Sequence, residues 1–329
     1  MIRVAINGFG RIGRLIYRAG YKDLDIVAVN DLGDANTMAH LLKYDSVHGN
    51  MDEEVYSKGN TIHVGKKKII FVQEKDPEKL PWKKLKIDIV VESTGFFRTY
   101  PDCMKHITAG ARKVLLSAPW KGDTPISQAI KGVNDKACQS SEIISNGSCT
   151  TNSLAPVVMV LQKEVGIESG LLTTIHSYTN DQKLLDLPHP DLRRARAAAI
   201  NMIPTSSGAA KALVEVFPEL DGKMDAHAIR VPTPCGSISD LTFIAKKKTS
   251  VEKINAAMKK AANSYLKNVL EYTEEPIVSH DIIGNPHSSI FDASLTQVIG
   301  GKLCKVFAWY DNEWGFSNRM IDVIKLMGR

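Results

Sequence analysis

The chain has 329 residues, of which 43% are hydrophobic and 24% are charged. At about 150 residues per domain, this length predicts roughly two domains, and the composition excludes a disordered chain and a disulfide-stapled miniprotein. The 42 Lys and Arg residues against 36 Asp and Glu residues give a net charge of +6, which suits anionic small molecules and does not by itself require nucleic acid.

The first predicted element is a strand over residues 2–7, which leads into the glycine-rich run Gly8-Phe9-Gly10-Arg11-Ile12-Gly13. A helical pattern follows, and its apolar face is formed by Ile12, Leu15, Ile16 and Ala19. A second strand is predicted over residues 25–29. A strand, a glycine turn, a helix and a second strand within about thirty residues form the context in which a G-x-G-x-x-G motif indicates dinucleotide binding.

The three glycines and a following carboxylate define the expected cofactor. Gly8, Gly10 and Gly13 allow a tight turn, a close approach of the backbone to a pyrophosphate, and packing of the helix on the strand. Asp31 lies 18 residues after Gly13, at the end of the second strand, where a carboxylate binds the adenosine ribose hydroxyls. A 2′-phosphate would meet a like charge there, so the sequence favours NAD over NADP.

Further strands in the first half are predicted over residues 69–72, 87–93, 113–117 and 142–145. Helical or turn segments separate most of them, which indicates an open, mostly parallel sheet. Ligands bind beyond the carboxyl ends of such strands. The loops at 92–95 and 117–119 are therefore expected to face the cofactor.

After about residue 148 the pattern changes. A helix is predicted over residues 154–165, opened by the run at 148–152, and another helical spacing recurs from Val251 through Tyr265 to Val269. The strands become longer and predict a mainly antiparallel sheet, with members at 171–178, 227–231, 238–246, 288–298 and 302–310. The polar, Pro-containing stretch at 180–203 is too long for a passive connection, so we expect a functional or interface loop.

The predicted fold class is therefore α/β, with an N-terminal Rossmann dinucleotide-binding domain and an α+β catalytic domain. The first domain is expected to span residues 1–148, and the second residues 149–313. A last helix, at about 314–329, is expected to return to the first domain.

Cys149 and His176 are the candidate catalytic pair. Cys149 lies at a loop-to-helix junction, where unpaired N–H groups and the helix dipole are expected to lower the pKa of a thiol, and neighbouring hydroxyls and an amide can donate to an oxyanion. Taken alone, Cys149 is as consistent with an inert buried cysteine, and His176 with a structural histidine on a strand. Together they match an activated thiol with its acid–base partner.

Anion-binding groups form a third cluster. Hydroxyls and N–H groups at a predicted helix start, together with nearby guanidinium groups, can bind phosphate, and such groups recur at residues 193–196, at 205–208 and at Arg230. Singly, each arginine is more typical of a surface ion pair. In combination they predict more than one phosphate position.

The cysteines and the N-terminus indicate the cellular setting. The five cysteines are an odd number without a CxxC pair, so no disulfide framework and no metal site is expected, and reduced thiols in a cytoplasmic enzyme are the expectation. Met1 leads directly into a strand pattern, which predicts no signal peptide. The longest apolar stretch, at 154–161, is too short to span a membrane.

Over essentially its whole length, the chain resembles the phosphorylating glyceraldehyde-3-phosphate dehydrogenases. The resemblance rests on N-G-F-G-R-I-G at 7–13, S-C-T-T-N at 148–152, H-S-Y-T at 176–179, R-V-P-T-P at 230–234 and W-Y-D-N-E at 309–313. The S-C-T-T-N block is very specific. The run D-L-R-R-A-R-A-A-A at 191–199 is similar to the bacterial and plastid branch of the family.

The resemblance implies the reaction and its partners. Cys149 would attack the aldehyde of glyceraldehyde 3-phosphate to form a thiohemiacetal, and His176 would take the hydroxyl proton as hydride passes to NAD. Inorganic phosphate would then cleave the thioester to an acyl phosphate. The resemblance also implies a homotetramer in which residues near Leu187 and Pro188 reach a neighbour's cofactor site.

The resemblance also implies roles for individual binding residues. Thr179, Arg194 and Arg230 would hold the substrate phosphate. The attacking phosphate would be held by Ser148, Thr150, Ser207 and Gly208. Besides the glycines and Asp31, the cofactor would be contacted by Arg11 and Ile12 at the pyrophosphate, Lys75 and Ser117 on the adenosine side, and Asn312 at the nicotinamide amide.

Several positions depart from the family pattern. Ser153 stands where a second cysteine is common, and Ser207 where threonine is more usual. Lys75 replaces a common arginine, and Cys235 replaces asparagine. The segment at 96–121 is atypical.

Three other functions remain open from the sequence. One is oxidation of erythrose 4-phosphate, with water releasing the acid. Another is an NAD-fold protein that binds RNA or host proteins, although no face combining aromatic and basic residues is evident, so nucleic acid is not expected as the primary partner. The third is a Cys–His hydrolase, which leaves the dinucleotide motif unexplained.

Overall fold

The structure is a computed structural model that describes residues 1–328. It divides into two compact units. The first unit contains Met1–Ser148 and the segment that begins at Ser317, and the second unit contains Cys149–Phe316. Among the described residues, no helix is both long and apolar enough to cross a membrane.

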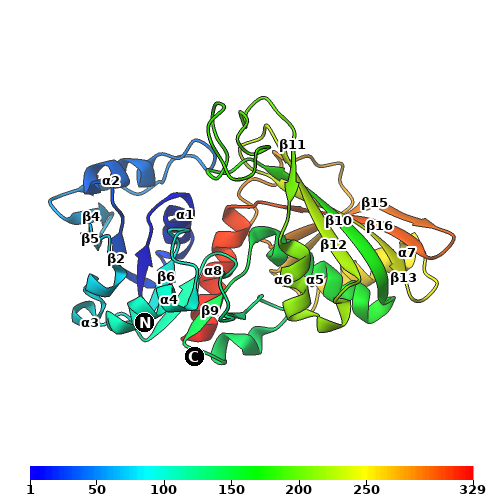
Figure 1. Cartoon of the computed structure of the whole chain (residues 1–329), viewed down its shortest axis with the longest axis horizontal. Coiled ribbons are helices and arrows are strands. Elements are labelled where there is room, and N and C mark those ends of the chain that lie inside the picture. Colours follow the sequence, from blue (N-terminus) through cyan, green and yellow to red (C-terminus); the bar gives the residue numbers. More distant parts are fainter. Residues whose placement is uncertain (329) are drawn as a thin grey trace. The chain divides into compact units, whose positions relative to one another are not determined.

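Within the described residues, the first unit contains a nine-stranded sheet in the order β3-β4-β5-β2-β1-β6-β7-β9-β8 (Figure 1). Its strands are β1 (Arg3–Asn7), β2 (Asp25–Asn30), β3 (Val55–Ser57), β4 (Thr61–Val64), β5 (Lys67–Val72), β6 (Ile89–Glu92), β7 (Lys113–Leu116), β8 (Ser127–Gln128) and β9 (Ile143–Ser145). The pairs from β5 to β8 are parallel. The predicted Rossmann sheet is thus confirmed. Strands β3 and β4, which pair antiparallel with each other and with β5, were not predicted.

Helices of the first unit connect these strands. They are α1 (Arg11–Gly20), α2 (Ala35–Lys43), α3 (Trp82–Leu85), α4 (Tyr100–Thr108) and most of α8 (Trp314–Met327), with short 3₁₀ turns at Pro77–Lys79 and Asp135–Gln139. In α1, Leu15 and Ile16 are fully buried as predicted, whereas Ile12 and Ala19 are only half-buried.

The C-terminal helix α8 belongs mainly to the first unit. Lys325 forms an ion pair with Asp23 at 2.6 Å, and Lys113 Nζ donates to the carbonyl of Met327 at 2.6 Å. The predicted return of this helix to the first domain agrees with these contacts. The predicted helix reached residue 329, which lies outside the described residues.

The second unit has a seven-stranded sheet in the order β11-β12-β10-β13-β16-β15-β14 (Figure 1), counted over residues 149–316. Its strands are β10 (Ile167–Ser177), β11 (Ile203–Ser206), β12 (Met224–Val231), β13 (Ser237–Ala245), β14 (Leu270–Thr273), β15 (Ser289–Ile299) and β16 (Leu303–Tyr310). Only the pairs β10–β12 and β14–β15 are parallel among these strands. The predicted, mainly antiparallel sheet is therefore confirmed.

Three α-helices accompany this sheet, namely α5 (Cys149–Glu164), α6 (Ala209–Val216) and α7 (Val251–Ala262), with a 3₁₀ turn at Pro218–Leu220. Helix α5 packs against β15 and β16, and nearly all of its residues from Thr150 to Leu161 are buried. Helix α7 ends at Ala262, so the predicted continuation of its helical spacing through Tyr265 to Val269 is wrong. Tyr265 is 48% exposed, whereas Val269 is buried outside the helix. The chain turns after Ala262, and Asn268 adopts a left-handed conformation with a φ of 66°.

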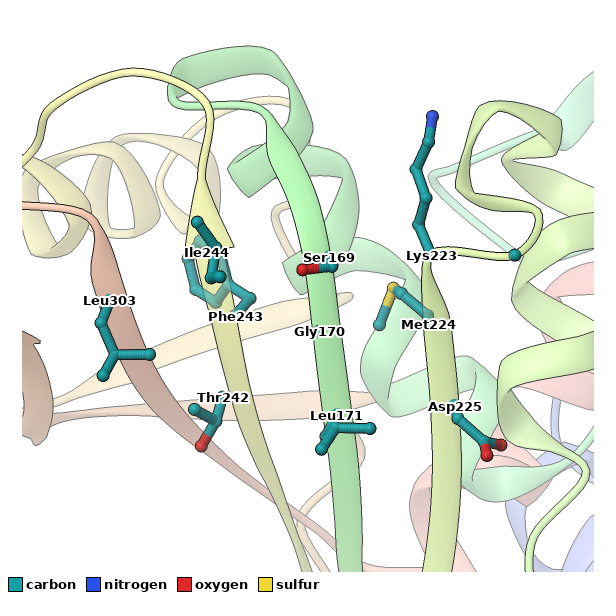
Figure 2. A pocket seen from close by; sticks show the side chains of 11 residues that line it. Ser169, Gly170, Leu171, Lys223, Met224, Asp225, Thr242, Phe243, Ile244 and Leu303 are labelled. Carbon is teal, nitrogen blue, oxygen red and sulfur yellow. The ribbon is translucent and has the colours of Figure 1, made fainter.

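One region of the second sheet leaves apolar side chains in contact with solvent. Leu171, Ile244 and Leu303 come from β10, β13 and β16 and are 67%, 40% and 44% exposed. Together with residues at the start of β12, they line a hollow of about 600 Å³ (Figure 2). The irregular segment at 180–202 also exposes apolar side chains, namely Leu184, Leu185, Leu187, Leu192, Ile200 and Met202. Such patches are typical of surfaces that associate with other protein surfaces.

Candidate active site

The first residue of α5 is Cys149, and its side chain meets His176 from β10. The Cys149 sulfur lies 3.3 Å from His176 Nε2. The turn before α5 requires glycine at 147, where φ is +64° and an added Cβ would lie 2.7 Å from Gln128 Oε1. Helix α5 starts at the cysteine itself, within the run at 148–152 that was expected to open the predicted helix at 154–165. The two side chains that the sequence singled out are in direct contact.

The tautomer of His176 follows from its backbone partner. The carbonyl oxygen of Ser177 lies 2.6 Å from Nδ1, and because a carbonyl can only accept, this contact places the ring hydrogen on Nδ1. Nε2 then presents a lone pair toward the Cys149 sulfur. Arg230 Nη1 donates to the same carbonyl at 3.0 Å. Its 2.9 Å approach to Nδ1 is then a close contact between two N–H groups and not a hydrogen bond, because a guanidinium can only donate.

Strand register explains how Arg230 reaches the histidine. Strands β10 and β12 pair in parallel, with His176 directly beside Arg230. The two residues are 54 positions apart in the chain, so their contact depends on this register.

Burial dominates the electrostatics of the pair. Removal of the sulfur from water raises the pKa of the Cys149 thiol, against the lowering effects of the Arg230 charge and of hydrogen bonds from Thr150. Burial, with the Arg230 charge, lowers the pKa of His176 to about 3. The predicted lowering of the Cys149 pKa is therefore wrong, because desolvation outweighs the helix start. The 3.3 Å contact lets the sulfur become nucleophilic by passing its proton to Nε2.

Tyr310 is a site residue that the sequence reasoning missed. Its hydroxyl bridges Thr150 Oγ1 at 2.9 Å and Thr174 Oγ1 at 2.7 Å. Its ring meets the His176 ring edge-on, with centroids 5.9 Å apart and an interplanar angle of 75°. The tyrosine thus braces the residue after Cys149 and the imidazole together. The motif W-Y-D-N-E at 309–313 contains Tyr310, but it does not indicate the contacts of the side chain, because β16 lies far along the chain from α5 and β10.

The candidate phosphate-binding residues are arranged around a network of charges. Arg194 donates to Asp181 at 2.6 Å, to Thr205 Oγ1 at 2.9 Å and to the carbonyl of Ser206 at 3.2 Å. Ser207 Oγ accepts from the N–H of Ala209 at 3.3 Å at the start of α6. The guanidinium of Arg194 is thus held in place in advance.

The remaining candidates around this network differ in their exposure. Gly208 is the exposed N-cap of α6 and carries no side-chain cap. Thr179 is half-buried after β10, and its N–H donates weakly to Gln182. Arg196, by contrast, is 63% exposed and pairs with Asp186. This is the surface ion pair that is typical of a single arginine.

In the first unit, the glycine-rich turn has the geometry that its sequence predicts. Gly8 has a φ of +92°, and a Cβ there would lie 2.6 Å from the N of Thr94. A Cβ at Gly13 would lie 2.1 Å from the carbonyl oxygen of Gly8, so helix α1 packs directly on the turn. At Gly10 a Cβ would meet nothing within 4 Å, and this N-cap of α1 has no side-chain cap. The helix start is therefore an open cradle for a phosphate group, and the residues fit a dinucleotide.

Asp31 and Arg11 flank this cradle. The Asp31 carboxylate accepts the N–H of Phe9 at 2.8 Å and that of Gly33 at 3.0 Å, which fixes its direction and leaves lone pairs to accept ribose hydroxyls. Arg11 forms an ion pair with Asp45, with Nη1 and Oδ2 3.2 Å apart. No sequence pattern identifies Asp45, which lies 34 residues after Arg11.

Replacing Asp45 by asparagine is expected to destabilise the protein in a pH-dependent way. Burial alone would raise the pKa of Asp45, but the N–H groups of His48 and Val47 and the charge of Arg11 prevail and lower it to about 2. Because the pKa is lower in the folded state, the stabilisation is present above about pH 4 and is lost as the pH falls through 2.

The measurement is the thermal unfolding midpoint of wild type and Asp45→Asn at pH 7 and pH 3. After allowance for solvent screening, we expect a loss of about 1 kcal/mol at pH 7, or about 2–4 °C, and a smaller difference at pH 3. Replacement of the exposed Asp52 by asparagine is the control and should show no such pH dependence. An equal difference at both pH values would contradict the expectation.

The other candidate cofactor residues lie at strand ends or in buried turns. Lys75 is exposed after β5, and Ser117 follows β7, with its N–H donating to the carbonyl of Glu92 at 3.0 Å. Asn312, in the second unit, is 6% exposed, and its Oδ1 accepts from Ser237 Oγ at 2.9 Å and from the Gly236 N–H at 3.1 Å. This leaves its amide NH₂ as the group that can donate to a ligand. Cys235 lies beside it, with the sulfur 3.1 Å from Asp311.

A Rossmann unit with a phosphate cradle, joined in one chain to a unit with a cysteine–histidine pair, defines the class of dehydrogenases that work through a cysteine. Comparison with known proteins agrees with this class. Residues 2–100 match the family described as glyceraldehyde 3-phosphate dehydrogenase, NAD binding domain, and residues 148–312 match its C-terminal domain. The chain belongs to the glyceraldehyde-3-phosphate dehydrogenase family.

Full-length relatives give the degree of similarity. The chain is 56% identical to glyceraldehyde-3-phosphate dehydrogenase of Thermotoga maritima over 99% of both chains. It is 54% identical to the Geobacillus stearothermophilus enzyme, over 98% of this chain and 97% of that one. It is also 54% identical to the Mycobacterium avium enzyme, over 100% of this chain and 99% of that one. The similarity therefore covers both units.

Proposed function

We propose that the protein oxidises glyceraldehyde 3-phosphate with NAD and inorganic phosphate to 1,3-bisphosphoglycerate, the reaction of glycolysis and gluconeogenesis. The observation that carries this proposal is the 3.3 Å contact between the Cys149 sulfur and His176 Nε2 in a chain of this family. Cys149 is the nucleophile and His176 the acid–base group.

The steps follow from the contact between the Cys149 sulfur and His176 Nε2. His176 Nε2 takes the thiol proton as the sulfur bonds to the aldehyde carbon, and returns it to the carbonyl oxygen to complete a thiohemiacetal. Bound NAD supplies the hydride acceptor for the oxidation. Nε2 then accepts the hydroxyl proton, and an acyl thioester remains on Cys149. Attack of phosphate breaks the carbon–sulfur bond, and Nε2 returns a proton to the leaving sulfur.

Phosphate recognition is assigned to two groups of residues. Thr179, Arg194 and Arg230 hold the phosphate of the sugar, supported by two guanidinium groups that are already oriented by hydrogen bonds. The attacking phosphate is held by residues with hydroxyl or N–H donors at the starts of α5 and α6, namely Ser148, Thr150, Ser207 and Gly208.

Cofactor recognition is assigned mainly to the first unit. Gly8, Gly10 and Gly13, with Arg11 and Ile12, receive the pyrophosphate at the start of α1, supported by the open space at Gly10. Asp31 accepts the adenosine ribose hydroxyls. Lys75 and Ser117 lie on the adenosine side, and Asn312 donates to the nicotinamide amide.

Replacing Arg194 by alanine is expected to raise KM for glyceraldehyde 3-phosphate by about 10- to 100-fold, because a charge-assisted contact to phosphate is lost. KM for unphosphorylated glyceraldehyde should stay within about twofold of the wild-type value. Steady-state kinetics with both substrates measure the difference. Arg196→Ala, which removes a neighbouring exposed arginine paired with Asp186, is the matched control and should leave both values unchanged. Equal losses with both substrates would contradict the role assigned to Arg194.

NADH formation with and without added phosphate tests the proposed function itself. Sustained turnover of glyceraldehyde 3-phosphate should require phosphate, and kcat/KM for this sugar should exceed that for erythrose 4-phosphate. Turnover that ignores phosphate would remove the acyl-phosphate step. A preference for the four-carbon sugar would assign the protein to erythrose-4-phosphate oxidation instead.

We also propose that the protein is a homotetramer in the cytoplasm. The apolar hollow on the second sheet (Figure 2) and the exposed leucines of the 180–202 segment support association. Leu187 and Pro188 in that segment are the residues proposed to reach a neighbour's cofactor site. The five cysteines are free thiols, as is usual in a reducing compartment. A measured mass of four chains in solution is the expected result.

A further inference from the structure

A buried polar network lies at the carboxyl ends of β1, β2 and β6, next to the glycine-rich turn. Its hub is Glu92, the last residue of β6, which is 1% exposed. One carboxylate oxygen accepts from Asn7 Nδ2 at 2.6 Å and contacts His106 Nε2 at 3.0 Å. The other accepts from the N–H of Thr94 at 2.8 Å and from its hydroxyl at 2.5 Å. A buried carboxylate is costly unless its oxygens are fully used, and here each oxygen has two partners.

Trp82 fixes the direction of the hydrogen bond between His106 and Glu92, because it contacts the other ring nitrogen of His106. Trp82 Nε1 lies 3.1 Å from His106 Nδ1, and both residues are completely buried. An indole nitrogen can only donate, so Nδ1 is an acceptor and the ring hydrogen is on Nε2. His106 therefore donates to Glu92. All four groups around the carboxylate donate hydrogen bonds, so both carboxylate oxygens must act as acceptors.

From this hub, hydrogen bonds reach the turn that receives the dinucleotide. Asn7 Oδ1 accepts from Asn30 Nδ2 at 2.7 Å, and the Asn30 carbonyl accepts the N–H of Gly8 at 2.8 Å. The Ser93 hydroxyl donates to the Gly8 carbonyl at 2.7 Å. Thr94, which Glu92 holds by two bonds, is the residue against which Gly8 packs without room for a Cβ. Glu92 therefore orders the groups that hold Gly8 on its two sides, namely Asn30 through Asn7 and Thr94 directly.

The same network extends to the loop that carries Lys75. Asn30 Nδ2 donates to the Glu74 carbonyl at 2.9 Å, and the N–H of Glu74 donates to Asn30 Oδ1 at 2.9 Å. Asp31 directly follows Asn30 in the chain. The Glu92 carboxylate therefore fixes the spacing of three loops, at the ends of β1, β2 and β5, whose residues we assign to the cofactor.

We propose that Glu92 is a positioning residue for NAD: without touching the cofactor, it holds the Gly8 turn and the loops at Asp31 and Lys75 in the arrangement that binds the dinucleotide. This inference rests on the proposed assignment of these loops to NAD. A cradle that is ordered before binding loses less conformational entropy when the ligand arrives, so the network contributes to affinity. The chemistry at Cys149 does not use it.

The test is Glu92→Gln, measured by direct titration of NAD. Whichever way the new amide is turned, its NH₂ faces two donors, and one pair of hydrogen bonds is lost. We expect Kd for NAD to rise about tenfold, with kcat at saturating NAD and KM for the sugar phosphate within about twofold of wild type. In the protein without NAD, the N–H of Gly8 should exchange with solvent faster, because its acceptor Asn30 is no longer held.

Two further variants separate positioning from loss of stability. Ile62→Val removes a methyl group from the fully buried core at β4, so it should lower the unfolding midpoint without changing Kd for NAD. Trp82→Phe removes the indole donor together with part of a fully buried ring and leaves Glu92 in place. It should raise Kd about two- to threefold and serves if Glu92→Gln does not fold.

The outcomes are distinct. An unchanged Kd in Glu92→Gln and Trp82→Phe, with wild type binding NAD, overturns the positioning role. An equal rise in Kd in Ile62→Val also overturns it, since general destabilisation would then explain the effect. Failure of wild type to bind NAD overturns the assignment of the loops to the cofactor, and with it the proposed function.

Discussion

Replacing Cys149 by serine is expected to lower kcat for oxidation of glyceraldehyde 3-phosphate by at least about 10⁴-fold. The sulfur at the start of α5 is the atom that bonds to the aldehyde carbon, and a serine hydroxyl beside the same imidazole is a far weaker nucleophile and a poorer leaving group from an acyl intermediate. Steady-state NADH formation measures the loss.

Binding and folding should survive this substitution. Kd for NAD and the unfolding midpoint should match wild type, because the cradle at Gly10 and Asp31 does not depend on the sulfur. Cys304→Ser in β16 is the matched control, since it also removes a thiol from the second unit, and it should retain activity. A Cys149→Ser protein with more than a tenth of wild-type kcat would remove Cys149 from the reaction.

Replacing His176 by asparagine is the second large change, with an expected fall in kcat of about 10²- to 10⁴-fold. The structure places Nε2 where it can take the thiol proton, and asparagine offers no group that accepts and returns protons near neutral pH. KM for the sugar phosphate should change little, because Thr179, Arg194 and Arg230, the residues assigned to the sugar phosphate, remain.

Alkylation gives an independent readout of the same contact. In wild type, iodoacetamide should modify Cys149 first, because Cys149 is only half-buried and contacts an imidazole that can take its proton. The other four thiols are buried, and burial raises the pKa values of Cys103 and Cys138 to about 12 and about 11. In His176→Asn, modification of Cys149 should slow at least about tenfold, since no base then takes its proton. Equal rates in the two proteins would show that the imidazole does not activate the sulfur.

Local sequence patterns predicted the parts of the fold and of the candidate site that depend on neighbours in the chain. The glycine turn, the strand before it and the helix after it lie within thirty residues, so spacing alone indicated the Rossmann unit and its cradle. Cys149 was recognisable because a thiol next to hydroxyls and an amide at a helix start is unusual. The change from short to long strands indicated the second, antiparallel sheet.

Contacts between residues that are far apart in the chain could not be predicted from local sequence patterns. The partner of His176 depends on the register of β10 against β12, which brings Arg230 beside it. The Tyr310 bridge depends on β16. Glu92 and Asn7 are 85 positions apart, yet they share the shortest bond of the buried network that involves a side-chain amide. Hydrophobic periodicity carries no information about these pairs.

The pKa of Cys149 was predicted in the wrong direction for a related reason. The helix start is visible in sequence, whereas the removal of the sulfur from water is a property of the packed unit, and the latter is the larger effect. The extension of α7 to Tyr265 failed because spacing continued past a turn that ends the helix. Both errors come from tertiary structure overriding a local signal.

The most direct measurement is the mass of the protein after mixing with glyceraldehyde 3-phosphate and NAD in the absence of phosphate. We expect one phosphoglyceroyl group per chain, attached to the peptide that carries Cys149 and released as acyl phosphate when inorganic phosphate is added. A chain without this group, a group on another residue, or a group that phosphate does not remove would contradict covalent catalysis by Cys149.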